Sequence, residues 1–433
     1  MTVLDPRKDH PGTKAQAVGN VPDLGKCTES QLRAIVDEQA ALLRSNASTE
    51  AVDILVASEE IAEARAWPAV AATARYLRAR VVLEDGRVDE ALGLIDAAAI
   101  GFREAGESLS AVRTGLGAMH ALDDLGRHAE AAAAGESMLA GLAALGPGPD
   151  TDWLEAATLG NLGVAYGFTG RHEDALAAQE TSAAIWDRLD LPHERALAEA
   201  NQAIELHSLG RARQACLLFD RALRGFEAAD DRLWIAKCHT HRAEALLQLG
   251  EFHPALEDVE AAREALRELG ATTEQSRLTI IAARARAGLD QPQLAIETLA
   301  LAIDDPETLP RERATAELLL GLAERQTGRT GVDALRSAHQ RFSDLGDDSS
   351  RLTAAIALAD ARGDIESLRS AHHEARSLGR PVHIVSSAVA LADHGDSSGL
   401  AAAAPVAIDL QLPVLVAAVA MREGGRALDE GAC

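Results

Sequence analysis

The sequence contains few residues of the types that support several common protein classes. Aromatic residues make up only 3% of its 433 residues, which disfavours a β-sheet core, where aromatic side chains are enriched. No stretch approaches the roughly 18 consecutive apolar residues of a membrane-spanning helix, and the N-terminal segment lacks the apolar core of a signal peptide. The 4 cysteines are widely spaced, at Cys27, Cys216, Cys238 and Cys433. That spacing argues against a disulfide framework and indicates a cytoplasmic protein.

Basic residues are also outnumbered. The chain has 42 Lys and Arg against 67 Asp and Glu, a net charge of −25, which argues against binding to nucleic acid or to an anionic membrane. The charge permits a basic partner, although solubility alone also explains it. Gly424-Gly425-Arg426 lacks the Lys-Ser/Thr that a nucleotide-binding loop needs. No cofactor is therefore predicted.

What the sequence has in abundance is one repeated turn. A Gly followed five residues later by Ala occurs at Gly86/Ala91, Gly126/Ala131, Gly170/Ala175, Gly210/Ala215 and Gly250/Ala255. The glycines are 40, 44, 40 and 40 residues apart, and a helix–turn–helix unit with a period near 40 indicates a helical solenoid. We expect each Gly to end one helix in a left-handed conformation, and each Ala to lie where the two helices cross most closely.

The period predicts an all-α superhelix of about ten helix pairs. We expect a disordered tail at 1–28, a helix pair at 29–66, a regular array at 67–270, degenerate repeats at 271–411 and a capping helix with a tail at 412–433. In the regular array, first helices are expected at 68–84, 108–124, 152–168, 192–208 and 232–248, and second helices at 87–104, 127–144, 171–188, 211–228 and 251–268. Large apolar residues near the ends of the second helices should pack against the next unit: Phe102, Leu142, Trp186, Phe226 and Leu266.

These units resemble the tetratricopeptide repeat (TPR). The residues that carry the resemblance are Gly163, Tyr166, Gly170-Arg171 and Ala175, and the resemblance extends over about 30–410. The unit of about 40 residues is similar to a bacterial variant found in peptide-sensing regulators, in sensor arms of transcriptional activators and in arms of caspase-like proteases. The Ala-, Arg- and Gly-rich composition is similar to that of actinobacterial proteins. The resemblance implies a right-handed superhelix whose first helices line a concave groove that holds a peptide.

Helical spacing identifies the side chains that would face this groove, because residues at i, i+4, i+7 and i+11 share one face. On that face Asn161, Asn201 and His241 recur 40 residues apart, and an amide can donate to and accept from a peptide backbone. The other predicted partner-binding residues are Phe168, His207, Ser208, Lys237, Glu244 and Gln248. Lys237 and Asn201 also resemble two members of a carboxylate clamp in chaperone-binding relatives, but Gly160 and Val164 replace its other Lys and Asn.

Catalytic and metal sites are not predicted. Cys238 and His241 are three residues apart on one helix, but no further Cys or His pair follows at zinc spacing. The same pair as a protease site would need a base from another helix and an oxyanion site. A buried thiol beside groove and surface histidines is the simpler interpretation.

The predicted function is therefore a cytoplasmic scaffold or receptor that binds a peptide segment of a partner protein, and not an enzyme. Three alternatives stay open. The chain could be a regulator that sequesters a signalling or transcription protein and releases it when a peptide binds. It could be a detached arm that docks onto an effector enzyme, or an enzyme that uses Cys238 and His241.

Overall fold

The structure is a computed structural model, and it describes residues 23–45, 49–270, 274–409 and 418–422. Within these residues the secondary structure is helical throughout, with one short 3-10 helix, η2 (Leu24–Lys26), ahead of α1. The predicted all-α fold of about ten helix pairs is confirmed. Residues 1–22 of the predicted tail lie outside the described residues, and so does most of 412–433, where a capping helix and a tail are predicted.

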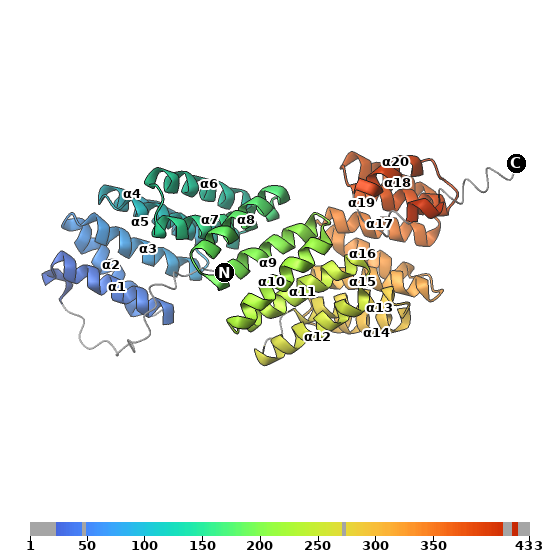
Figure 1. Ribbon diagram of the computed structural model, residues 1–433, viewed down its shortest axis with the longest axis horizontal. Helices are drawn as coiled ribbons and strands as arrows, with labels where there is room; N and C mark the ends of the chain where they lie inside the picture. The colour runs from blue at the N-terminus through green and yellow to red at the C-terminus, as the bar shows by residue number, and fades with distance from the viewer. Residues whose placement is uncertain (1–22, 46–48, 271–273, 410–417, 423–433) are drawn as a thin grey trace. The chain divides into compact units, whose positions relative to one another are not determined.

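Twenty α-helices follow one another as pairs (Figure 1). The first helices of the pairs are α1 (Glu29–Ser45), α3 (Pro68–Glu84), α5 (Ser108–Asp124), α7 (Pro149–Phe168), α9 (Pro192–Ser208), α11 (Arg232–Leu249), α13 (Gln275–Gly288), α15 (Pro310–Gln326), α17 (Asp348–Arg362) and α19 (Pro381–Asp393). The second helices are α2 (Thr49–Ala64), α4 (Val88–Glu104), α6 (His128–Leu145), α8 (His172–Arg188), α10 (Ala212–Ala228), α12 (Phe252–Glu268), α14 (Pro292–Asp304), α16 (Val332–Asp344), α18 (Ile365–Ser377) and α20 (Leu400–Asp409). Helices α3, α5 and α9 have the predicted bounds, whereas α7 begins three residues early because Pro149 is suited to a first turn.

The chain forms two compact units, Met1–Glu205 and Leu206–Cys433, and the boundary falls near the end of α9. In each unit a helix contacts the helices just before and just after it in sequence. Successive first helices also contact one another, α3 with α5 and α5 with α7 in the first unit, and α11 with α13 and α13 with α15 in the second. No contact of similar extent joins successive second helices in the described part of the chain. The first helices therefore form a continuous surface in each unit, which we call the first-helix wall.

The repeated glycine ends each first helix as predicted. Gly86, Gly126, Gly170, Gly210 and Gly250 all have φ between 70° and 77°, a region that costs a residue with a Cβ roughly 1–2 kcal/mol. At Gly170 the N–H of Arg171 donates to the carbonyl of Tyr166 at 2.9 Å, and the N–H of Gly170 donates to that of Gly167 at 3.0 Å. This pair of bonds is a Schellman motif, which satisfies carbonyls left free at the helix end.

Alanine packing holds each pair together. The side chains of Ala91, Ala131, Ala175, Ala215 and Ala255 are all 0% exposed. The large apolar residues expected to pack between units, Phe102, Leu142, Trp186, Phe226 and Leu266, are also buried. Trp186 meets Trp153 of the neighbouring first helix edge to face, with ring centroids 5.7 Å apart. The small and large positions inferred from the period therefore occupy the core.

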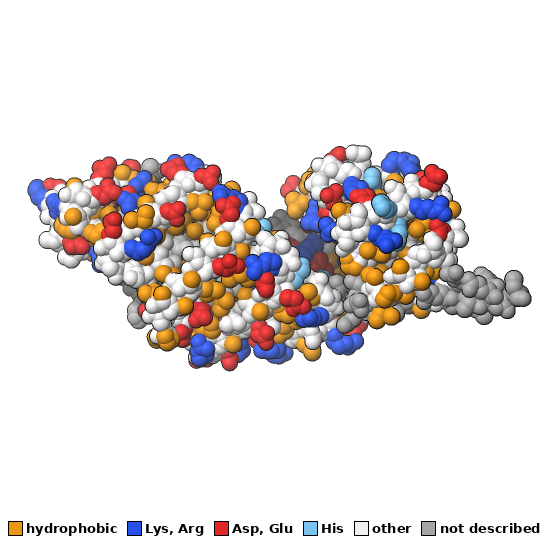
Figure 2. All heavy atoms as spheres, turned by 90° about the horizontal axis from the view of Figure 1, so that it is seen from above, with side chains coloured by type: hydrophobic (Ala, Val, Ile, Leu, Met, Phe, Trp, Pro, Cys, Tyr) orange, Lys and Arg blue, Asp and Glu red, His pale blue; other side chains and the backbone are white. Residues whose placement is uncertain are grey.

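The surface carries charges of both signs. On the face shown in Figure 2, acidic and basic side chains are interspersed with apolar ones. Many of them form ion pairs one helical turn apart, such as Arg171 with Asp174 at 2.8 Å. Among the helices that the structure describes, none is both long and apolar enough to cross a membrane.

Candidate functional site

The two asparagines of the predicted column lie on first helices of the first unit, Asn161 on α7 and Asn201 on α9. Both side chains are partly buried. Neither side-chain amide has a hydrogen-bond partner among the described residues. Since a partly buried amide normally satisfies its donors and acceptors, these two are available to an external partner.

Two other predicted residues lie at the ends of these helices. Phe168 is 69% exposed, and its ring stacks on His128 of α6, with ring centroids 4.2 Å apart. It therefore lies beside the turn between α5 and α6. Ser208 is exposed at the end of α9, in the second unit.

In the second unit, α11 presents four predicted residues, all partly buried. The ammonium group of Lys237 lies 4.8 Å from the ring centroid of Trp234, at the start of the same helix. The ring of His241 is parallel to that of buried Phe219 on α10, at 6.3 Å between centroids. Gln248 has a buried Oε1 with no hydrogen-bond partner in the described part of the chain.

Glu244 is bound by an arginine from the next first helix. Arg277 of α13 donates from Nη2 to Oε2 of Glu244 at 2.8 Å and from Nε to Oε1 at 3.1 Å. The same Nη2 lies 3.2 Å from Nδ1 of His241, which accepts this bond when its proton is on Nε2. Burial alone would raise the pKa of Glu244, but the interactions with His241 and Arg277 lower it to about 2. Glu244 is therefore ionised at neutral pH and fixes α11 to α13.

Two further side chains complete what we call the charged cluster, which comprises His207, His241, Glu244, Arg277 and Arg284. Burial lowers the pKa of His207, and the positive charges of Arg277 and Arg284 lower it further. His207 is on α9 and Arg284 is on α13, so the charge of Arg284 acts on a first helix two repeats earlier in the sequence. Nδ1 of His207 is buried and has no hydrogen-bond partner among the residues described.

Arg284 differs from Arg277 in having no partner. It makes no hydrogen bond or ion pair with any residue in the described ranges. Its side chain is exposed to solvent, yet desolvation by the surrounding protein lowers its pKa. Its guanidinium is therefore accessible to a ligand on the first-helix wall.

Sequence analysis missed Arg277 and Arg284, although the signal was present. They follow Lys237 and Glu244 by the repeat period of 40 residues. The predicted stripe ended at Gln248, and the next unit has Asp290 where the turn glycine is expected. Asp290 nonetheless has φ 59°, the left-handed value of the glycines, and Ala295 is 0% exposed. The repeat therefore continues through α13.

The Cys238 and His241 pair does not form a reactive site. Cys238 is 1% exposed, and burial raises the pKa of its thiol to about 12. Such a thiol stays protonated at neutral pH and is a poor nucleophile. The histidine next to Cys238 in sequence, His239, is held by Asp258 of α12, with 2.7 Å between Nδ1 and Oδ1. In the described part of the chain, no group of three or more His, Cys, Asp or Glu side chains could hold a metal ion.

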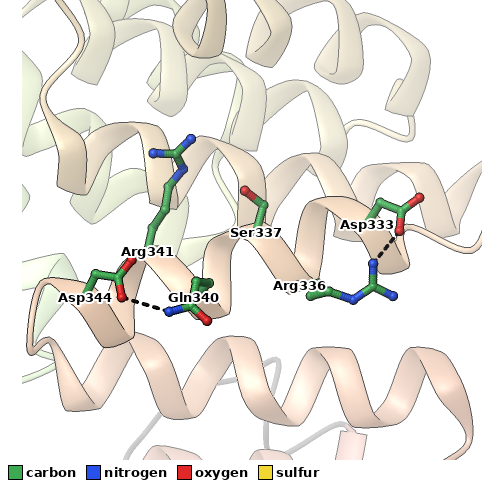
Figure 3. Close-up of a pocket in the computed structure, with 6 residues that line it drawn as sticks. All are labelled: Asp333, Arg336, Ser337, Gln340, Arg341 and Asp344. Carbon is green, nitrogen blue, oxygen red and sulfur yellow. Dashed lines mark hydrogen bonds and ion pairs between the residues drawn. The ribbon is translucent and has the colours of Figure 1, made fainter.

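A separate surface hollow lies on α16. Six polar or charged side chains line it, all from this one helix: Asp333, Arg336, Ser337, Gln340, Arg341 and Asp344 (Figure 3). Arg336 pairs with Asp333 at 2.7 Å, and Gln340 donates to Asp344 at 2.8 Å. Ser337 and Arg341 donate to Glu317 of α15 at 2.9 and 3.0 Å, so all six side chains already have partners, and the hollow is open to solvent. It lacks the convergent side chains of a ligand site.

Comparison with known proteins identifies the fold. No family model and no curated protein matches the sequence. Among solved structures, the apo form of the quorum sensor NprR from B. thuringiensis matches with a TM-score of 0.59 at 13% identity, over 80% of this chain and 97% of that one. The apo form of RapI matches with a TM-score of 0.56 at 12% identity, over 83% and 99%. A signal-transduction ATPase with a TPR sensor, PH0952 from Pyrococcus horikoshii, gives 0.54 at 11% identity, over 76% of this chain and 55% of that one.

These matches confirm the predicted resemblance. The chain has the fold of TPR proteins and is similar in structure to RapI, to the quorum sensor NprR and to PH0952, a protein with a TPR sensor.

Proposed function

We propose that the chain is a cytoplasmic receptor that binds a peptide, or an extended segment of a partner protein, on its first-helix wall. One observation carries the proposal. Asn161 and Asn201 occur at the same position of successive repeats, and neither amide has a hydrogen-bond partner within the described residues. A row of free amides at a regular spacing can bond to the alternating N–H and C=O groups of a peptide backbone.

The comparisons favour a regulatory use of this binding. NprR is a quorum sensor, and PH0952 is a signal-transduction ATPase with a TPR sensor. A chain with the same fold could hold a signalling protein and release it when a peptide binds, which requires a peptide that prefers one of two conformations. We therefore propose a signal-responsive regulator as the specific form of the receptor.

The test is to recover the ligand with matched variants. The full chain would be expressed in its native host and purified, and small peptides would be released with acid and identified by mass spectrometry. The double variant Asn161→Ala/Asn201→Ala should bind the recovered peptide about 10- to 100-fold more weakly in calorimetry, because each buried hydrogen bond contributes about 0.5–1.5 kcal/mol.

Gln214 supplies the control. It is an exposed amide on the second helix α10, away from the first-helix wall, so Gln214→Ala should bind as the wild type does. Equal affinity of the double variant and the wild type would refute the asparagine mechanism. Recovery of a small metabolite in place of a peptide would refute the receptor assignment.

A further inference from the structure

The local charge along α11 and α13 differs in sign from that of the whole chain. The chain carries −25, but the stripe on these two helices contains Lys237, Arg277 and Arg284 against two acids, Glu244 and Glu274, the latter just before α13 and 3.5 Å from Arg277. Local charge governs contacts at close range, because charges more than about 8–10 Å apart are largely screened at physiological salt. A ligand beside this stripe therefore meets a net positive charge.

The fold uses only one of these three cations in an ion pair. Arg277 is bound by Glu244 at 2.8 Å. Lys237 lies over the ring of Trp234 and pairs with no carboxylate in the described part of the chain. Arg284 has no partner among those residues at all. Two positive charges on this wall are thus left for a ligand.

Arg284 lies where an anion would gain most from it. A guanidinium keeps its proton throughout the physiological range and presents several donors in one plane, a geometry that matches a carboxylate. Its side chain is exposed and has no partner in the described residues, so an anion can reach it without displacing another group, and a charge-assisted hydrogen bond is stronger than a neutral one. The charge of Arg284 also acts on His207, whose Nδ1 has no hydrogen-bond partner in the described chain. A second polar group without a partner is therefore within electrostatic range of the guanidinium.

We propose that the peptide bound by the second unit is acidic, and that Arg284 binds one of its carboxylates while Lys237 attracts a second negative charge. This inference rests on the proposed function and specifies the chemical class of the ligand. The carboxylate can be a Glu or Asp side chain or the C-terminus of the peptide, and the two sources call for separate arms of the test.

The test uses pooled random hexapeptides in four forms. One internal position is fixed as Glu or as Gln, and each pool is made with a C-terminal acid or a C-terminal amide. The full-length protein is mixed with equal amounts of all four pools and separated by gel filtration, and the retained peptides are counted by mass spectrometry. We expect wild type to retain at least one carboxylate form about 10- to 100-fold more than its neutral counterpart. This ratio corresponds to the free energy that one charged hydrogen bond contributes to binding. A preference for Glu over Gln identifies a side chain as the source, and a preference for acid over amide identifies the C-terminus.

Variants assign that preference to Arg284. In Arg284→Gln, the ratio of carboxylate peptide to neutral peptide retained should fall close to one. Arg284→Lys keeps the charge and should keep much of the preference for the carboxylate form. Arg224 is the matched control, because it is exposed on the second helix α10 and has no partner in the described residues. Arg224→Gln removes the same charge from the chain and should leave the ratio unchanged.

The outcomes separate the two proposals. Equal retention of charged and neutral peptides by wild type, or an unchanged ratio in Arg284→Gln, overturns the acidic-ligand proposal and leaves peptide binding intact. Retention of no peptide form by wild type overturns both. A circular dichroism spectrum identical to wild type shows that a lost preference in Arg284→Gln does not come from unfolding.

Discussion

Two arginines on one helix show how strongly a side chain's role depends on its neighbours. Arg277 and Arg284 are seven residues apart on α13 and therefore share a face of the helix. Burial would lower the pKa of Arg277, but Glu244 and Glu274 together raise it, whereas desolvation lowers the pKa of Arg284 despite the attraction of Glu244. The first arginine contributes to the fold, and the second is free for a ligand.

This difference predicts that the same substitution lowers stability at Arg277 and leaves it nearly unchanged at Arg284. Arg277→Gln should lower the free energy of unfolding by about 1–3 kcal/mol, because it leaves the carboxylate of Glu244 partly buried without its cation. Arg284→Gln should change it by less than about 0.5 kcal/mol, since it breaks no hydrogen bond or ion pair and removes only the weaker attraction of Glu244 across a longer distance. Urea unfolding followed by circular dichroism compares the two. Equal losses would contradict the contacts assigned to Arg277.

Glu244 should make stability depend on pH in an acid window. Its pKa is about 2 in the folded protein and roughly 4.3 in an unfolded chain. Because the folded-state pKa is the lower one, the stabilisation is complete above pH 4.3 and disappears as the pH falls through 2. Its full size is about 1–3 kcal/mol, after allowance for the partial exposure of the carboxylate.

The matched variant isolates this residue from the other carboxylates. Wild type and Glu244→Gln should differ in urea midpoint at pH 7, and the difference should shrink progressively at pH 4, 3 and 2. A difference that stays constant across this range would show that the charge of Glu244 does not stabilise the fold.

At the scale of the helix, the turns set where each element ends. Most of them use glycine at positive φ, but Ala66 (56°), Asp190 (56°), Asp230 (52°) and Asp290 (59°) adopt the same left-handed conformation. Ala66 is the clearest case, because it is exposed and has no polar side chain that could compensate for the strain. Its place between α2 and α3 corresponds to that of Gly106 between α4 and α5.

Ala66→Gly should therefore stabilise the chain. Relief of the left-handed strain should raise the free energy of unfolding by about 1–2 kcal/mol. The greater conformational freedom of glycine in the unfolded chain should lower it by about 0.5–1 kcal/mol. The expected net gain is about 0.5–1 kcal/mol, measured as a higher urea midpoint. Ala133→Gly is the control, since Ala133 is exposed inside α6 and should lose about 1 kcal/mol. A loss in both variants would refute the strain at Ala66.

At the scale of the whole molecule, the repeat made most of the fold predictable. A period of 40 with fixed glycines places the helix ends, and the small residue five positions later places the core, because both follow from contacts within one unit. The same period predicted that Asn161, Asn201 and Lys237 lie at equivalent faces of their first helices. Domain divisions within the array remain predictions.

The interactions between helices were not predictable in the same way. The bond of Arg277 to Glu244 and the stacking of Phe168 on His128 depend on how neighbouring helices are placed, which the spacing along one helix does not determine. The free state of Arg284 is likewise a property of its surroundings. Its position could be read from the period, but its lack of a partner required the structure.

Because helices contact mainly their sequence neighbours, local damage should stay local. Phe342 is 1% exposed and packs among α15, α16 and α17 of the second unit. Phe342→Ala should cost about 3–5 kcal/mol there and speed amide hydrogen exchange in those three helices, while α3 to α8 of the first unit exchange as in wild type. Phe168→Ala, at a ring that is 69% exposed, is the matched control and should leave exchange in α15–α17 unchanged. A uniform increase throughout α3 to α8 in Phe342→Ala would show instead that the whole array unfolds as a single cooperative body.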